Sequence, residues 1–105
     1  MKVGIDLVRI DRFLGKEKIA DKILSDYEYE LYLKSSNKIE YLASRFAVKE
    51  ALIKCLELNI LSVNLKDIVV MKKGNGAIYV LYNDKKYNAS LSHEKEYCTG
   101  VVIDE

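Results

Sequence analysis

The sequence predicts an α+β fold in which one long helix and two shorter helices pack with an antiparallel sheet. A strand-like apolar run, KVGIDLV, opens the chain, and the longest helical periodicity follows in residues 38–57. Only the second half changes to the two-residue period of strands. Because helices and strands are segregated along the chain, an α+β arrangement is favoured over alternating βαβ units.

The composition indicates a small globular domain. The chain has 105 residues, of which 50% are apolar and 31% charged, and its formal net charge is +1. We therefore predict one domain, residues 1–105, for which self-association is a reasonable way to complete the core. A net charge so near zero creates no overall field for nucleic acid or membrane, so neither is predicted as a partner.

The first predicted strand, residues 2–8, contains an unusual acid. Its two faces would carry Val3, Ile5 and Leu7 on one side and Gly4, Asp6 and Val8 on the other. An acid in the middle of an apolar strand is unfavourable unless it is paired or binds a cation. Asp6 is thus either a cation ligand or a residue that is solvated or salt-bridged.

Two short helices are expected next. Residues 12–24 form the first, with Asp11 as a possible N-cap, although Gly15 weakens the pattern. Ser25 and Glu28 match the S-x-x-E capping box and start a second helix that ends near residue 33.

The long helix, residues 38–57, begins with a weaker capping pattern at Asn37 and Glu40. Its central stretch SRFAVKEALIK carries charged side chains at Arg45, Lys49, Glu50 and Lys54. Such cations can hold phosphates and such a carboxylate can hold a metal, but Glu50 and Lys54 also fit a surface ion pair. If the fold brings Glu50 to Asp6, the pair describes a metal–diphosphate site.

The second half predicts a run of antiparallel strands rich in Val, Ile and Tyr. The strands are expected at residues 67–72, 77–82, 87–92 and 97–103. Turn sequences at residues 73–76 and 83–84 connect the first three as hairpins.

Two smaller groups of polar residues have open interpretations. His93, the only histidine, follows a strand pattern and is either a turn residue or a donor to phosphate oxygens. Arg9, Arg12 and Lys16 recur at helix-compatible intervals. They form either a solvated helix face or a docking strip for an acidic partner.

The cysteines and the hydropathy predict a cytoplasmic protein. Cys55 and Cys98 fit no metal-ligand spacing and are expected to be buried thiols in a reducing compartment. The chain shows neither a signal-peptide pattern nor an apolar run long enough to span a bilayer.

Three segments together resemble holo-[acyl-carrier-protein] synthase, the short bacterial type of 4′-phosphopantetheinyl transferase. They are GIDLVRIDRF, then LSDYEYELY followed by SRFAVKEALIK, and SLSHEKEY near the end. The resemblance covers essentially the whole chain. It implies transfer of the phosphopantetheine arm of coenzyme A to a serine of apo acyl carrier protein, with release of adenosine 3′,5′-bisphosphate.

The resemblance also implies roles for individual residues. Mg²⁺, with Mn²⁺ as a possible substitute, would be held by Asp6 and Glu50, and the serine proton would pass to Glu50 or to a metal-bound water. Lys54 joins these two carboxylates among the predicted catalytic residues. Coenzyme A phosphates would be bound by Arg45, Lys49, Lys54, Ser92 and His93. The carrier protein would be bound by Arg9, Arg12 and Lys16.

Family members of this short type are homotrimers with each site at a subunit interface, so that Asp6 and Glu50 would face His93 of the next subunit. The sequence also departs from the family pattern. Arg9 replaces the usual acid, residues 55–60 read CLELNI in place of a glycine-rich turn, and Gly76-Ala77 replaces G-x-P. Two rival hypotheses are a catalytically silent homologue that binds carrier protein or coenzyme A, and a small nucleic-acid-binding module.

Overall fold

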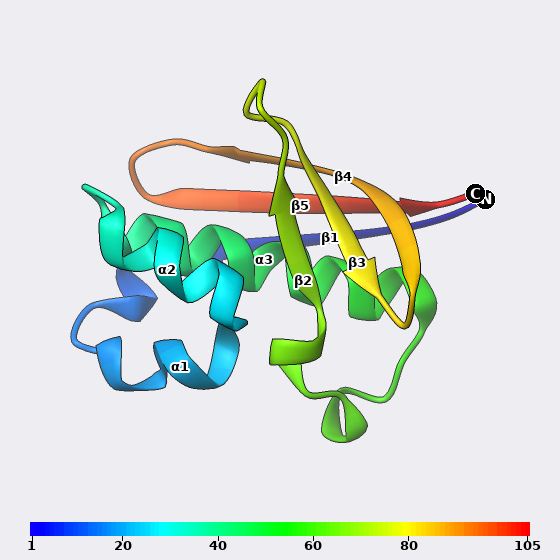
Figure 1. Ribbon diagram of the computed structural model, residues 1–105, viewed down its shortest axis with the longest axis horizontal. Helices are drawn as coiled ribbons and strands as arrows, with labels where there is room; N and C mark the ends of the chain where they lie inside the picture. Colours follow the sequence, from blue (N-terminus) through cyan, green and yellow to red (C-terminus); the bar gives the residue numbers. More distant parts are fainter.

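A computed structural model describes residues 1–105 as a five-stranded antiparallel sheet with helices on one face (Figure 1). The strands are β1 (Lys2–Arg9), β2 (Val69–Lys72), β3 (Ile78–Tyr82), β4 (Lys85–His93) and β5 (Tyr97–Asp104). The helices are α1 (Ala20–Ile23), α2 (Asp26–Lys34) and α3 (Lys38–Leu56), with 3-10 turns at Ile10–Phe13, Glu17–Ile19, Ile60–Ser62 and Leu65–Asp67. The predicted α+β class is confirmed.

The sheet order β1-β5-β4-β3-β2 places the first and last strands side by side. Asp6 of β1 pairs with Gly100 of β5, and the two chain ends lie together in Figure 1. The long helix α3 crosses the inner face of the sheet, so that residues near position 6 meet residues near position 50. This arrangement determines where the candidate site lies.

Helix α3 approaches the sheet closely because two glycines lie under it. A Cβ atom on Gly4 would overlap the carbonyl oxygen of Ala51, and one on Gly100 would lie 2.8 Å from the Cα of Val48. Real Cβ atoms do not tolerate such distances, so glycine at both positions permits this separation of helix and sheet. Elsewhere α3 packs through its own small side chains, Ala43, Ala47 and Ala51, which are fully buried.

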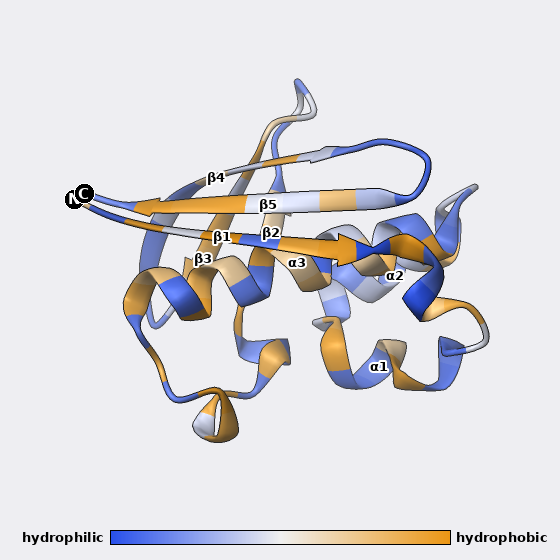
Figure 2. Ribbon diagram, turned by 180° about the vertical axis from the view of Figure 1, so that it is seen from behind, coloured by the Kyte–Doolittle hydropathy of each residue, from blue (hydrophilic) through white to orange (hydrophobic).

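The outer face of the sheet is apolar but uncovered in the single chain. Val3, Ile5 and Leu7 of β1 are 62%, 62% and 67% exposed. Figure 2 shows hydrophobic stretches along β1 and β5 on this side of the molecule. Contiguous exposed apolar surface of this kind marks an interaction site.

The helix predicted for residues 12–24 is wrong, because the chain forms three short pieces there. Gly15 has a φ of +72°, which a right-handed helix cannot include, and it separates the first 3-10 turn from the next two pieces. The capping box at Ser25 and Glu28 is confirmed, and so is the Asn37 cap of α3.

The strand predictions are confirmed with shifted ends. The strand expected at residue 67 begins at Val69, after a 3-10 turn, and β4 extends from Lys85 to His93. Cys55 and Cys98 are buried free thiols, as predicted. None of the helices combines the length and the hydropathy that a membrane-spanning segment requires.

Candidate active site

The fold brings Asp6 and Glu50 together although 44 positions separate them along the chain. Asp6 lies on the inner face of β1, and Lys54, one helical turn after Glu50, donates to Asp6 Oδ1 at 2.9 Å. Asp6 is close enough to Glu50 for its negative charge to raise the pKa of the Glu50 carboxyl. Thr99 fixes the strand here, because its hydroxyl donates to the Asp6 carbonyl oxygen at 2.8 Å.

The electrostatics of this pair favour a bound cation. Burial is the main cause of the raised pKa of Glu50, and the charge of Asp6 raises it further, whereas Lys54 and Arg12 lower it. Two carboxylates that repel one another at a partly buried position gain stability when a cation lies between them. A cation at Asp6 and Glu50 would therefore relieve the repulsion between the two carboxylates.

Glu50→Gln should raise the melting temperature of the protein at pH 7 in the presence of a chelator. The folded state binds the Glu50 proton more tightly than the unfolded chain, so that ionisation opposes folding. This loss of stability begins once the pH exceeds the pKa of Glu50 in the unfolded chain. It is complete above the raised pKa of Glu50 in the folded protein. The difference in melting temperature between Glu50→Gln and wild type should therefore shrink as the pH is lowered towards about 4. An equal or lower melting temperature at pH 7 would contradict this expectation.

The donor set fits Mg²⁺ better than a softer metal. No group of three or more His, Cys, Asp or Glu side chains converges anywhere in the structure, so a closed zinc-type cage is absent. Mg²⁺ keeps several waters and is usually held by one or two carboxylates together with substrate phosphates. Asp6 and Glu50 are the residues that would hold it.

A basic groove lies between α3, the end of β2 at Lys72 and the end of β4 at His93. One part, about 290 Å³, is lined by Glu40, Arg45, Lys72 and His93 among others. A second part of about 260 Å³ shares Arg45, Lys72 and Leu91 with it. Arg45, Lys72 and His93 can bind an anionic ligand, while Glu40 adds one negative charge to the same groove. Lys72 is a member that sequence reasoning missed.

Arg45 and His93 are held in place by neighbours on α3. The Arg45 guanidinium stacks 4.1 Å from the centre of the Tyr41 ring and donates to Ser44 Oγ at 3.0 Å. His93 Nε2 lies 3.3 Å from Glu40 Oε1. Arg45 is buried, and its Nε has no hydrogen-bond partner within the chain. A buried donor without a partner is unusual in a folded protein.

Ser92 does not line this groove. Side chains alternate along a strand, so Leu91 and His93 face α3 while Ser92, opposite Thr99 of β5, faces away. Ser92 instead borders a shallow pocket of about 190 Å³ at the other side of the sheet. Within one chain, Ser92 therefore lies apart from Arg45, whereas His93 borders both pockets.

Lys49 requires a correction, because it lies in the core and has no access to a ligand. Its Nζ is 2.6 Å from Glu28 Oε1 and also donates to the carbonyl oxygens of Ile23 and Leu65, at 2.6 and 2.9 Å. Both charged side chains are fully buried. Burial lowers the pKa of Lys49, and the charge of Glu28 opposes this effect. The prediction that Lys49 binds coenzyme A phosphate is thus not supported by its position.

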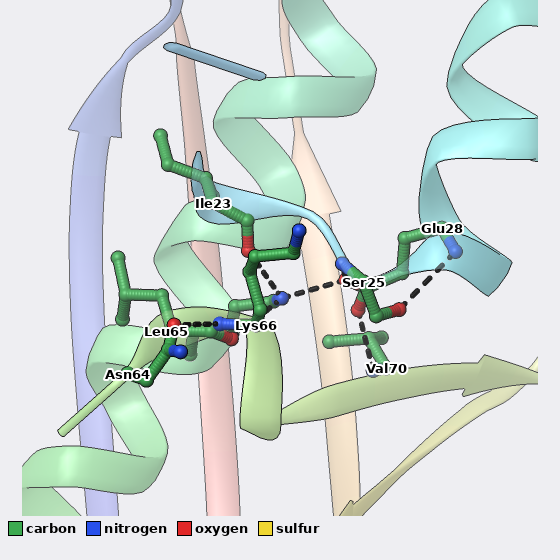
Figure 3. A network of polar contacts seen from close by, with 8 residues as sticks. Ile23, Ser25, Glu28, Asn64, Leu65, Lys66 and Val70 are labelled. Carbon is green, nitrogen blue, oxygen red and sulfur yellow. Dashed lines mark hydrogen bonds and ion pairs between the residues drawn. The ribbon is translucent and has the colours of Figure 1, made fainter. Parts of the chain in front are cut away.

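Glu28 is the centre of this buried network, which Figure 3 shows together with Ile23, Ser25, Leu65 and Val70. Its Oε1 accepts from the Ser25 amide at 2.7 Å, and its Oε2 accepts from the Val70 amide at 2.6 Å. The carboxylate therefore closes the capping box of α2 and at the same time holds the start of β2. The lysine–glutamate pair ties α1, α2, α3 and β2 together.

The predicted docking strip lies at the edge of the site. Arg12 stacks over the Phe46 ring at 5.2 Å, and its charge acts on Glu50. Arg9 is exposed and pairs with Asp11 at 3.3 Å. Lys16 is also exposed. Arg9 and Lys16 are therefore accessible, and Arg12 is the member of the strip whose charge acts on Glu50.

Comparisons with known proteins agree on one family. The model of the 4′-phosphopantetheinyl transferase superfamily matches residues 2–103. The chain is 36% identical over 111 residues to the holo-[acyl-carrier-protein] synthase of Acholeplasma laidlawii, covering 98% of this chain and 94% of the relative. It is 40% identical over 101 residues to the synthase of Mycoplasmopsis pulmonis, covering 95% and 86%.

Solved structures agree with this result. The holo-[acyl-carrier-protein] synthase of Helicobacter pylori, in complex with coenzyme A, superimposes with a TM-score of 0.84 at 28% identity, covering 96% of this chain and 97% of that one. The Bacillus anthracis synthase, in complex with CoA (3′,5′-ADP), also gives a TM-score of 0.84 at 28% identity, covering 96% and 92%. On fold, sequence and the paired carboxylates together, the chain belongs to the 4′-phosphopantetheinyl transferase superfamily.

Proposed function

We propose that the protein transfers the 4′-phosphopantetheine arm of coenzyme A to a serine of apo acyl carrier protein and releases adenosine 3′,5′-bisphosphate. The observation that carries this proposal is the convergence of Asp6 and Glu50 beside Lys54. Family membership and the activity named for the relatives support the same reaction.

The chain's own residues account for binding and proton transfer. Mg²⁺ held by Asp6 and Glu50 would neutralise the negative charge that develops on the diphosphate leaving group. Lys54 adds a cation on the same side of the site. Glu50 is the carboxylate of the chain that would accept the serine proton.

The groove would hold the nucleotide part of coenzyme A. Arg45, Lys72 and His93 line it and would meet phosphate oxygens. Lys49 has no part in this binding, because it is fully buried. The altered segment CLELNI, residues 55–60, leads from the end of α3 into a 3-10 turn at Ile60–Ser62, and none of its residues lines the groove.

The test is the mass of an apo acyl carrier protein after incubation with this protein, coenzyme A and Mg²⁺. An increase by one phosphopantetheine group supports the proposal. No increase with several carrier proteins, while coenzyme A still binds, would favour a silent homologue.

The exposed residues Arg9, Arg12 and Lys16 would bind the acidic carrier protein. Their charges are accessible at the rim of the site, and attraction between opposite charges mainly raises the rate of encounter. Added salt should therefore slow capture of the carrier protein more than it slows turnover of bound substrate.

We also propose a homotrimer with each site completed at a subunit interface. The outer face of β1, with Val3, Ile5 and Leu7, supports this because it would otherwise leave a large apolar surface in water. Next to it, a hollow of about 130 Å³ is lined by Ile5, Val101 and Ser92 among others.

Ile5→Lys should convert the assembly into monomers and abolish most of the activity. A lysine there would place a charge within the desolvated interface, and residues needed for one site would be separated. Light scattering after gel filtration should fall from three times the 12.1 kDa chain mass to one. Leu61→Lys is a matched control, because Leu61 is 92% exposed and lies far from the sheet face. A trimeric Ile5→Lys variant would argue against this interface.

A further inference from the structure

Lys54 is the counter-ion of the carboxylate pair. Its Nζ lies 2.9 Å from Asp6 Oδ1 and 3.1 Å from the Ile5 carbonyl oxygen. Its side chain is 57% exposed, whereas that of Asp6 is 16% exposed. A flexible four-carbon stem thus brings an ammonium group from the solvent side onto a carboxylate that is mostly covered.

We infer that Lys54 is a temporary counter-ion, which a divalent cation displaces from Asp6 when it binds; this rests on the metal site of the proposed function. Both cations need the same negative charge. A metal on Asp6 and Glu50 would lie within a few ångströms of the ammonium group, and like charges at that distance repel strongly. Lys54 is the partner that moves, because it is exposed, while Asp6 is fixed on its strand by Thr99.

The exchange has a consequence for substrate binding. Without metal, Lys54 limits the repulsion between the two carboxylates and keeps Asp6 in position. Once displaced, the ammonium group is free to bind an anionic oxygen of a diphosphate on the same side of the site. Lys54 therefore alternates between two anionic partners, one in the chain and one in the ligand.

The direct test uses Mn²⁺ alone as the probe, without coenzyme A or carrier protein. Free Mn²⁺ is measured by electron paramagnetic resonance during titration of the purified protein. Lys54→Met should bind Mn²⁺ about threefold or more tightly than wild type, because the competing cation is gone. Lys54→Arg should stay within about twofold of wild type, since a cation on a long stem remains.

Two further variants distinguish direct competition for Asp6 from a general effect of nearby positive charge. Arg12→Met removes a positive charge that acts on Glu50 without contacting Asp6, so that its gain in affinity should be clearly smaller than that of Lys54→Met. Asp6→Asn should abolish tight binding. Circular dichroism verifies that each variant is folded, and Lys54→Gln repeats the measurement with a polar side chain.

The outcomes separate this inference from the proposed function. An unchanged or weaker affinity in Lys54→Met, or an equal gain in Arg12→Met, would overturn the role of Lys54 alone, provided that wild type binds Mn²⁺ and Asp6→Asn does not. If wild type binds no Mn²⁺, both the displacement and the metal site are refuted.

Discussion

Replacing Lys49 by methionine should lower the free energy of unfolding by about 3–5 kcal/mol, the typical cost of removing one partner of a buried ion pair. Glu28 would remain buried without its counter-charge, and the carbonyl oxygens of Ile23 and Leu65 would each lose a donor. Urea unfolding followed by circular dichroism measures the change directly.

Two comparisons make this prediction sharp. Lys54→Met is the matched control, because it removes an exposed lysine from the same helix and should cost less than about 1 kcal/mol. Adding Glu28→Gln to Lys49→Met should recover part of the stability. Glutamine carries no charge, yet its carbonyl oxygen still accepts from a backbone amide. If Lys49→Met is as stable as wild type, Lys49 is accessible and its assignment to the core is wrong.

Glu50→Gln should reduce the rate of phosphopantetheine transfer by about 10²–10⁴-fold, the usual range for loss of a general base, while the fold is retained or stabilised. The amide neither accepts the serine proton nor contributes charge to a metal. The rate is read from the mass of the carrier protein over time at saturating Mg²⁺.

Glu57→Gln provides the matched control for this variant. Glu57 follows α3 and pairs with Lys2 at 3.5 Å on the surface, so the same chemical change there should leave the rate within about twofold. A Glu50→Gln protein with more than a tenth of the wild-type rate would remove Glu50 from the reaction. A lower melting temperature at pH 7 would instead trace the loss to the fold.

The local patterns predicted most elements because their signals lie within a few residues. The capping box of Ser25 and Glu28 and the long helix are examples, and the resemblance paired Asp6 with Glu50. The sequence could not reveal that Glu28 also neutralises Lys49, 21 positions later, because only packing shows which helix stripe is covered. Lys72 was missed for the same reason, since its position beside Arg45 exists only in the folded chain.

The break in the predicted helix near Gly15 shows a different limit of prediction from the sequence. Helical spacing of apolar residues in 12–24 was real, but it could not show that the glycine adopts a positive φ and breaks the helix. Helix propensity predicted that glycine at this position weakens the helix by about 1 kcal/mol. The tertiary packing of Phe13 and Ala20 on opposite sides of the turn outweighed the helical pattern.

The close contact of α3 with the sheet has a consequence for the choice of cation. Gly4 precedes Asp6 by two residues on the same face, and Gly100 lies directly opposite Asp6 in the neighbouring strand. Both touch α3 within one turn or so of Glu50. The backbone segments that carry the two carboxylates are therefore held at a fixed separation. A site that cannot widen suits small ions with short metal–oxygen distances, and it should select Mg²⁺ or Mn²⁺ over the larger Ca²⁺ by radius.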